Sequence, residues 1–344
     1  MRKLATIRRI DEIRPIPDAD SIECAVVGGW TIVVKKGDFT SGSLACFVEV
    51  DAWVPNDLAP YLSKGKEPKE FEGVKGERLR SVRLRGQLSQ GLLLPLNEGN
   101  TLHNNNNFIE VNESQDVSEF LSIIKWEAPI PAQLSGQVRG LFPSSIPKTD
   151  QERIQNLSDK LPDWQDRGYI WEVTEKLDGT SMTVFLERDG RFGVCGRNWE
   201  LTETSENSLW RAARKTNLET SIRETGRAIA IQGELIGEGI QGNLYKLKGQ
   251  HFYVYDIYDI ADTRYLTALE RVQLVKQFGI EHVPVIGLGT LELNSTANSL
   301  LLHAEGKSEI CSTAEREGLV YKCIQDPSIS FKAISNKFLL KTGG

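Results

Sequence analysis

Short apolar runs separated by small polar turns dominate the first third of the chain. Hydrophobic residues gather at 22–27, 30–34, 44–50 and 91–96. Gly28 and Gly29 separate the first two runs, and such a pair is typical of a hairpin turn. Runs this short are typical of strands, and regular turn signals between them favour a small barrel. The pattern therefore predicts a β-barrel over residues 1–100.

A basic stretch interrupts this pattern between the third and last predicted strands. Residues 64–85 carry many lysines and arginines, and Arg78, Arg80 and Arg83 lie in the densest part. Among small barrels, the OB type is a common nucleic-acid binder, and a basic surface on it suits a phosphate backbone. We therefore expect residues 1–100 to form an OB-fold nucleic-acid-binding module in which Arg78, Arg80 and Arg83 contact nucleic acid.

The pattern changes after residue 100. The polar stretch 97–107, with its run of asparagines, predicts a surface loop, and we place a linker at 101–130. A second domain of mixed α and β structure is expected at 131–344, and residues 149–153 have the pattern of a capped helix start. Strands are predicted at 170–174, 181–187, 229–232, 252–257 and 319–323, and helices at 208–216 and 267–278.

Composition narrows the class of protein. The chain has 344 residues, a formal charge of -6 and a pI near 5.5, which argues against general coating of nucleic acid but allows a local basic groove. The five cysteines form no Cys-x-x-Cys pair, so neither a zinc ribbon nor a disulfide scaffold is expected. No apolar run is long enough to cross a bilayer, and the charged N-terminus lacks a secretory signal. We expect a cytoplasmic protein, or a nuclear one in a eukaryote.

The candidate chemistry centres on Lys176-Leu177-Asp178-Gly179. This four-residue match is weak on its own, because a charged strand end followed by a turn gives the same letters. Further segments follow in order, each combining charged residues with glycine or aromatic residues. They are Cys195-Gly196-Arg197-Asn198, Gly233-Glu234-Leu235, and the stretches 252–257, 317–322 and 330–335.

With these motifs the sequence resembles the covalent nucleotidyltransferases, which include ATP-dependent RNA ligases, DNA ligases and mRNA capping guanylyltransferases. The resemblance is greatest to ATP-dependent RNA ligases of the Deinococcus type. It rests on the N-terminal OB-like module, the segment 147–156 and a chain that ends shortly after Lys332. It implies an α+β fold, in which the OB-type barrel is followed by an adenylyltransferase domain of antiparallel sheets flanked by helices.

The resemblance also implies an activity. An RNA ligase of this kind joins a 3′-OH to a 5′-phosphate through lysyl-AMP and an adenylylated 5′-phosphate, and we expect it to seal nicks in duplexes. The expected partner is RNA or an RNA-containing duplex, and the expected state is a monomer. A DNA ligase and a capping enzyme are alternatives, but both usually carry an OB domain after the catalytic domain. A non-catalytic OB-fold binder is a further alternative, which the intact motifs argue against.

Three lysines carry the implied chemistry. Lys176 would attack the α-phosphorus of ATP and form a phosphoramide bond. A lysine near its ordinary pKa of about 10.4 is almost entirely protonated and cannot do this. Lys322, Lys332 and a divalent metal would lower that pKa and offset the charge on the phosphates.

Three acids accompany the lysines. Asp178, Glu234 and Glu317 would be costly beside a phosphate unless they hold Mg2+ or Mn2+. We expect them to do so through the water shell that such ions keep. Glu234 or Glu317 could instead contact the ribose of ATP, and ordinary strand-end carboxylates are the plainer alternative. Gly179 fits a backbone turn beside a nucleotide, where a side chain would clash.

The remaining implied contacts surround the nucleotide. Arg197 suits the ribose of ATP or a nucleic-acid phosphate, because its guanidinium matches such oxygens. Tyr255 would stack on adenine with Phe252 as the second candidate, although both also fit a core strand. Glu175 would recognise adenine. Arg153 would contact the β- or γ-phosphate, unless it pairs with a neighbouring acid.

Two positions depart from the pattern of related ligases. Relatives often have a lysine where Ser330 stands, so Lys332 would act on the α-phosphate alone or with help from Lys322. Many also have asparagine where this chain has Ser181, which makes a contact with the RNA 3′ end less certain.

Overall fold

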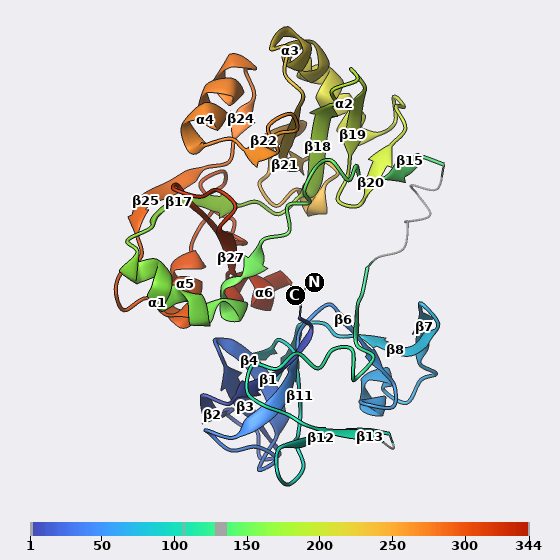
Figure 1. Cartoon of the computed structure of the whole chain (residues 1–344), viewed down its shortest axis with the longest axis vertical. Coiled ribbons are helices and arrows are strands. Elements are labelled where there is room, and N and C mark those ends of the chain that lie inside the picture. Colours follow the sequence, from blue (N-terminus) through green and yellow to red (C-terminus); the bar gives the residue numbers. More distant parts are fainter. Residues whose placement is uncertain (1–2, 106, 128–135, 343–344) are drawn as a thin grey trace. The chain divides into compact units, whose positions relative to one another are not determined.

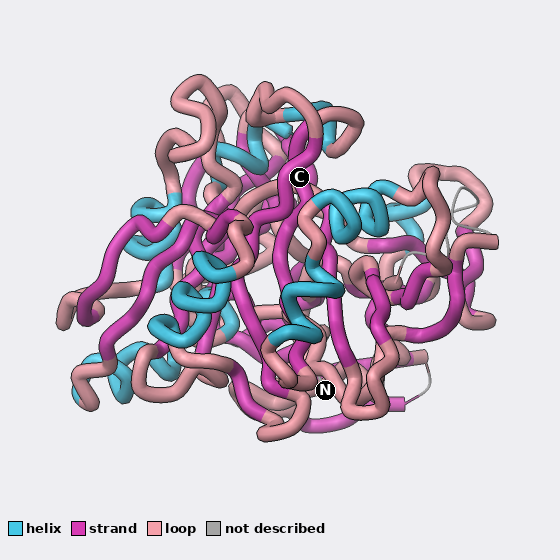
Figure 2. Tube along the Cα trace, turned by 90° about the horizontal axis from the view of Figure 1, so that it is seen from above, coloured by secondary structure: helices cyan, strands magenta, loops and turns pink. Residues whose placement is uncertain are grey.

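The chain divides into two compact units, and Figure 1 labels many of their helices and strands. The computed structural model describes residues 3–105, 107–127 and 136–342. One unit comprises Met1–Pro129 with Leu339–Gly344, and the other comprises Ile130–Phe338. Strands make up most of the regular structure along the trace (Figure 2). None of the described helices is long and apolar enough to cross a membrane.

Two small sheets build the core of the N-terminal unit. One has the order β1-β5-β11, and the other has the order β2-β3-β4. Their strands are β1 (Ala5–Arg9), β5 (Leu44–Val48), β11 (Leu92–Leu94), β2 (Glu12–Pro15), β3 (Ile22–Val27) and β4 (Trp30–Lys35). The four runs predicted from the apolar pattern are confirmed as strands, within about two residues at each end, whereas β1 and β2 were not predicted.

The strand β5 is buried on both faces, which explains its continuous apolar run. Cys46 and Val48 lie in one hydrophobic cluster with Ile7, whereas Phe47 lies in a second cluster with Trp30. Successive side chains of a strand face opposite ways, so a strand between two clusters must be apolar at every position. The alternation expected of a half-buried strand is therefore absent here.

The rest of the N-terminal unit is a third sheet and two hairpins. The sheet has the order β14-β6-β8-β7, with β6 (Ala52–Pro55), β7 (Lys69–Phe71), β8 (Val74–Arg78) and β14 (Ile124–Lys125). The hairpins are β9 (Val82–Leu84) with β10 (Gln87–Ser89), and β12 (Thr101–Asn104) with β13 (Asn107–Glu110), and a short 3-10 helix covers Pro60–Ser63. Among the described residues these sheets stay separate and do not close into one barrel ladder.

The predicted linker at 101–130 is wrong up to Lys125. Thr101–Glu110 form a hairpin, and Ile124 pairs with Trp53 of β6, so this stretch belongs to the N-terminal unit. Polar side chains on a hairpin exposed to solvent give the same letters as a loop, and only the pairing separates the two. Residues 128–130 lie outside the described part of the chain.

Two largely antiparallel sheets dominate the second unit. Within residues 136–342, the larger has the order β15-β20-β19-β18-β21-β22-β23, with β24 pairing to β22, and the smaller has the order β16-β27-β26-β17-β25. The larger contains β15 (Val138–Leu141), β18 (Thr180–Leu186), β19 (Phe192–Cys195), β20 (Trp199–Leu201), β21 (Ile229–Gly237), β22 (Gln250–Asp259), β23 (Arg264–Tyr265) and β24 (Glu281–His282). The smaller contains β16 (Glu152–Arg153), β17 (Ile170–Lys176), β25 (Val285–Thr290), β26 (Gly318–Cys323) and β27 (Ser330–Ile334). All five predicted strands are confirmed.

Helices cover these sheets through apolar faces. Leu209, Leu218 and Leu274 bury α2 (Ser208–Lys215), α3 (Leu218–Glu224) and α4 (Ala268–Gln277) against the larger sheet. The core of the smaller sheet includes side chains of α1 (Leu161–Asp166) and α5 (Ala297–Ala304). The last helix is α6 (Asn336–Thr342), and short 3-10 turns cover Ile154–Asn156, Ser158–Lys160 and Gln241–Asn243. Both predicted helices are confirmed, and Thr267 with Glu270 forms a capping box at the start of α4.

The helix start predicted at 149–153 is wrong. Glu152 and Arg153 form the short strand β16 instead, parallel to β27, with Glu152 opposite Phe331 and Arg153 opposite Lys332. A threonine followed three residues later by glutamate resembles a capping box, but pairing with β27 takes these backbone groups. The consequence for the site is that the segment after Pro147 runs beside Lys332.

Candidate active site

The loop Leu177–Gly179 joins the two sheets and carries the centre of the motif. Lys176 is the last residue of β17 in the smaller sheet, and Thr180 opens β18 in the larger. Leu177 anchors the loop in a small apolar cluster. A Cβ on Gly179 would lie 2.4 Å from the carbonyl oxygen of Leu235, so glycine is required by a close approach of the protein backbone.

Lys176 is held by a carboxylate. Its Nζ donates to both oxygens of Glu317 at 2.7 Å. Burial lowers the pKa of Lys176, but Glu317, Glu234 and Asp178 outweigh burial, so the net shift is upward. The expectation that neighbouring lysines lower this pKa is wrong for the chain without ligands, because the nearest charges are acids.

The acids around Lys176 are themselves perturbed. Burial, with the charges of Glu317 and Asp178 adding to it, raises the pKa of Glu234 to about 8. Burial and Glu317 raise the pKa of Asp178 to about 6. Burial is the main cause of both shifts and neighbouring carboxylates add to it, so a cation bound beside these acids would favour their charged forms.

The carboxylates do not converge tightly enough to ligate a metal themselves. No group of three or more His, Cys, Asp or Glu side chains among the described residues could hold a metal ion directly. Asp178, Glu234 and Glu317 nevertheless lie close enough to Lys176 for their charges to raise its pKa. The charge of Glu317 also raises the pKa values of Asp178 and Glu234. The donor set therefore fits a divalent cation that keeps its water shell, as Mg2+ does.

Lys322 lies in a buried ion pair that joins the two sheets. Its Nζ, on β26, donates to Asp256 on β22, and the two side chains are only 10% and 3% exposed. Burial lowers the pKa of Lys322, although Asp256 opposes the shift. Asp256 lies inside the aromatic motif at 252–257, but the sequence did not identify it as a site residue.

Lys332 and Arg197 share one acid. Asp150 accepts from the Nζ of Lys332 at 3.3 Å and lies 3.5 Å from a guanidinium nitrogen of Arg197. This contact brings together residues from β27, the loop after β19 and the segment after Pro147. Asp150 was inside the segment 147–156 quoted for the resemblance, yet only the fold reveals its place between the two cations.

The two aromatic candidates for stacking on adenine separate clearly. Phe252 is 4% exposed and packs in the core of the larger sheet, so its proposed role is wrong. Tyr255 is the unpaired residue of a β-bulge, because Gln232 pairs with Asp256 and Gly233 with Val254. The hydroxyl of Tyr255 lies 2.9 Å from that of Thr149, and burial with the charge of Glu234 raises its pKa.

Glu175 and Arg153 flank the lysines. Glu175 is buried, and its Oε2 accepts from the backbone N–H of Glu309 at 2.8 Å. Burial raises the pKa of Glu175, with the Ser308 hydroxyl partly opposing the shift. Arg153 is half-buried beside Lys332 in the parallel register of β16 and β27. The structure thus gathers Asp178, Glu234 and Glu317 around Lys176, and it brings Lys332 and Arg197 together at Asp150.

Comparison with known proteins identifies the family. A family model for RNA ligases matches residues 170–337, and an OB-fold domain model matches residues 4–96. A Naegleria gruberi RNA ligase mutant with AMP and Mn is 48% identical, with a TM-score of 0.83 and 99% of each chain covered. The chain belongs to the RNA ligase family.

Other structures of the Naegleria gruberi RNA ligase agree. A mutant with ATP and Mn is 48% identical with a TM-score of 0.82, covering 98% of this chain and 99% of that one. The same ligase with PPi is 48% identical with a TM-score of 0.81 and 99% coverage of both chains. No curated protein sequence matches. The family prediction is confirmed, whereas the Deinococcus subfamily stays a prediction.

The arginines predicted to contact nucleic acid differ in this RNA ligase. Arg78 donates to Asp51 at 3.0 Å, and its guanidinium lies 3.9 Å from the ring centre of Trp126. Its contacts are therefore internal to the N-terminal unit. Arg80 and Arg83 are exposed and form no ion pair with any described residue.

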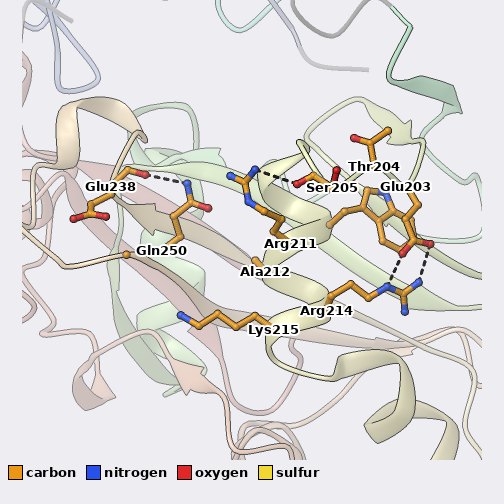
Figure 3. Close-up of a pocket in the computed structure, with 11 residues that line it drawn as sticks. Glu203, Thr204, Ser205, Arg211, Ala212, Arg214, Lys215, Glu238 and Gln250 are labelled. Atoms are coloured by element: carbon orange, nitrogen blue, oxygen red, sulfur yellow. Dashed lines mark hydrogen bonds and ion pairs between the residues drawn. The ribbon is translucent and has the colours of Figure 1, made fainter.

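An open groove lies elsewhere on the catalytic unit of the RNA ligase. Its volume is about 820 Å³, and α2 and the start of β22 line it (Figure 3). Arg214 pairs with Glu203 at 2.6 Å, and Arg211 donates to the backbone carbonyl of Glu206, so these cations are engaged within the protein. None of the predicted ATP, metal or nucleic-acid residues lines this groove.

Proposed function

We propose that this RNA ligase uses ATP to join an RNA 3′-OH to a 5′-phosphate, and that it seals nicks in duplexes. The observation that carries the proposal is Lys176, held at 2.7 Å by Glu317 in a ring of carboxylates and within the lysine motif of the family. Structures of the related Naegleria ligase hold ATP, AMP or PPi, which are the substrate of lysine adenylation, the nucleotide part that would be transferred, and the leaving group.

Lys176 would begin the reaction. Its Nζ attacks the α-phosphorus, a nitrogen–phosphorus bond forms, and pyrophosphate leaves as the bond to the bridging oxygen breaks. Lys176 must first lose a proton, and the carboxylate of Glu317 is within reach to accept it. Because the pKa of Lys176 is raised, its amine is protonated when ATP and metal are absent, and a protonated amine cannot attack phosphorus.

The carboxylates hold a metal in the proposal. Asp178, Glu234 and Glu317 would bind Mg2+ or Mn2+ through its waters, and the ion would supply positive charge to the phosphates. With the carboxylate charges offset, burial would no longer be outweighed, and the pKa of Lys176 would fall. The same three acids thus restrain the nucleophile at rest and allow its activation when ATP and the metal are bound.

The cations would receive the phosphates. Lys332 and Arg197 are held at one point by Asp150, and a phosphate can replace that carboxylate because both present oxygens to the same donors. Lys322 lies deeper and stays balanced by Asp256. Tyr255 and Glu175 would contact the adenine, and Arg153 would reach the outer phosphates.

The N-terminal unit would bind the RNA. Arg80 and Arg83 lie on or next to the β9–β10 hairpin, and both are exposed. Unpaired exposed arginines suit a phosphate backbone and give a salt-dependent affinity. The five cysteines are all free thiols, which fits a reducing compartment such as cytoplasm or nucleus. A monomer stays a prediction, which light scattering would test.

Sealing of labelled nicked duplexes tests the proposal. The full-length enzyme is given duplexes with RNA or DNA on each side of the nick, with ATP or GTP and with Mg2+, Mn2+ or EDTA. We expect sealing of nicks with an RNA 3′-OH, in ATP and either metal only. Equal sealing of all-DNA nicks would favour a DNA ligase, and lysine labelling from GTP without sealing would favour a capping enzyme.

A further inference from the structure

A tyrosine outside every predicted motif holds the loop that follows Lys176. The backbone N–H of Asp178 donates to the hydroxyl of Tyr245 at 2.7 Å. Tyr245 is 3% exposed, and its ring packs with Leu177 and Tyr253 in a small apolar cluster. The ring is thus fixed by packing while its hydroxyl reaches the lysine loop.

The turn that carries Tyr245 is itself firmly built. The side-chain amide of Asn243 donates to the carbonyl of Leu247 at 2.9 Å and accepts from the N–H of Leu247 at 3.0 Å. Gln241, Asn243 and Lys246 all have positive φ, which side chains other than glycine rarely adopt. Such conformations persist only where the surroundings hold them, and they gather at functional sites.

The turn contacts the lysine loop twice and a second active-site segment once. Besides Tyr245, the Nε2 of Gln241 lies 3.4 Å from the carbonyl oxygen of Gly179. On its other side, Lys246 donates to Thr313 at 3.1 Å, in the stretch that also packs around Glu175 through Glu309. The turn therefore braces the loop from outside, against the segment that borders the expected adenine site.

We propose that Tyr245 is a positioning residue for lysine adenylation, an inference that rests on the proposed function of Lys176. The hydroxyl fixes the backbone of Asp178, and through it the direction in which Lys176 leaves β17. An attacking atom misplaced by about 1 Å can cost about a hundredfold in rate, so the loss of one hydrogen bond that fixes this loop can slow the reaction strongly. Because Tyr245 does not touch ATP in the proposal, its loss should slow the step without weakening ATP binding.

Tyr245→Phe in the full-length enzyme tests this inference. The variant keeps the ring and removes only the hydroxyl. Single-turnover labelling with α-labelled ATP gives the maximal rate of lysyl-AMP formation and the ATP concentration for half-maximal rate. We expect the maximal rate to fall about ten- to a hundredfold, and the half-saturating ATP concentration to stay within about twofold.

Tyr253→Phe is the matched control. Tyr253 lies in the same apolar cluster, but its hydroxyl interacts with Glu281 instead of the lysine loop. We expect this variant to label at the wild-type rate, and both variants to melt within about 3 °C of wild type. The control separates the hydrogen bond to Asp178 from the general loss of a buried hydroxyl.

Each result has a distinct meaning. A wild-type maximal rate for Tyr245→Phe would overturn the inference, as would an equal loss in Tyr253→Phe. A change confined to half-saturating ATP would also overturn it, because Tyr245 would then act in binding. If wild type takes up no label while folded, the proposed function itself falls, and this inference falls with it.

Discussion

The lysines of the second unit and the arginines Arg80 and Arg83 of the N-terminal unit differ in their burial and in their partners. Lys176, Lys322 and Lys332 each lie within hydrogen-bond distance of a carboxylate before any ligand is present. Arg80 and Arg83 are exposed and have no ion pair with the described residues. A paired, part-buried cation is held in one place by its carboxylate, whereas an exposed arginine without an ion pair suits a phosphate backbone at many positions.

Arg78 shows why charge density alone misleads. It lies only two residues before Arg80 in the sequence, yet it pairs with Asp51 and its guanidinium lies over Trp126. Its environment resembles that of Lys176 and Lys322, which also contact carboxylates, more than that of Arg80 and Arg83. The cations of this chain therefore fall into two groups, those that are buried and paired with a carboxylate and those that are exposed. The two groups should respond differently to substitution.

The largest effect is expected at Lys322. Lys322→Met leaves the carboxylate of Asp256 buried and unpaired, which should cost about 3–5 kcal/mol of stability as well as more than a hundredfold in activity. Urea unfolding and single-turnover labelling measure the two losses. Lys332→Met is the matched control, because its more exposed pair with Asp150 should cost about 1 kcal/mol or less while activity still falls. Equal stability losses would contradict the division.

Glu234 predicts a pH dependence of stability. Its pKa is about 8 in the folded chain against an ordinary 4.5, so between these values the folded state holds more protons than the unfolded state. Stability without metal should therefore fall as pH rises through that window, by roughly 3–4 kcal/mol between pH 5 and 8. Thermal melts in EDTA from pH 5 to 8 measure it, and Glu234→Gln should flatten the profile. A profile that rises with pH in wild type would refute the assignment.

Substitution of Arg78 should affect stability, whereas substitution of Arg80 and Arg83 should affect binding of nucleic acid. Arg78→Ala should lower stability by about 1 kcal/mol, since its pair with Asp51 and contact with Trp126 are partly exposed. Arg80→Ala with Arg83→Ala should leave stability unchanged and reduce the salt slope of duplex binding by about 1–2. Calorimetry and binding titrations over a salt series measure these. An unchanged slope would remove these arginines from the RNA surface.

The smallest effect is expected at Asp150. Asp150→Asn removes the charge that competes with phosphate for Lys332 and Arg197, at the cost of their mutual alignment. We expect half-saturating ATP to change by less than about tenfold, with the salt dependence of ATP binding increased. Equilibrium binding of ATP to the Lys176→Ala background measures this. A complete loss of ATP binding would instead place Asp150 in direct contact with the nucleotide or its metal.

The sequence predicted those features of the molecule that depend on residues close together in the chain. The apolar runs of both units became strands, and the charged motifs placed Lys176, Asp178, Glu234 and Glu317 at the join of the two sheets. It missed features set by pairing between distant segments. The hairpin at Thr101–Glu110 has the pattern of a loop, and residues 149–153 have the pattern of a helix start, although Glu152 and Arg153 pair with β27.

The partners of the site residues were the hardest to foresee. Asp256 and Asp150 are single acids inside stretches already quoted, but only the fold brings them to Lys322 and Lys332. Phe252 and Tyr255 lie in one strand, but Phe252 packs in the core of the larger sheet, whereas the hydroxyl of Tyr255 lies beside that of Thr149. Tyr245 carries no sequence signal, because its hydroxyl meets a backbone N–H that any residue could supply.

The most direct test of the central claim is to find where AMP becomes attached. The enzyme is incubated with ATP and Mn2+ without RNA, digested, and its peptides are analysed by mass spectrometry. Lys176, alone among the cations that contact carboxylates, should carry AMP, and Lys176→Arg should carry none because a guanidinium stays protonated. AMP on Lys322, on Lys332 or on no residue of a folded, ATP-binding enzyme would contradict the assignment.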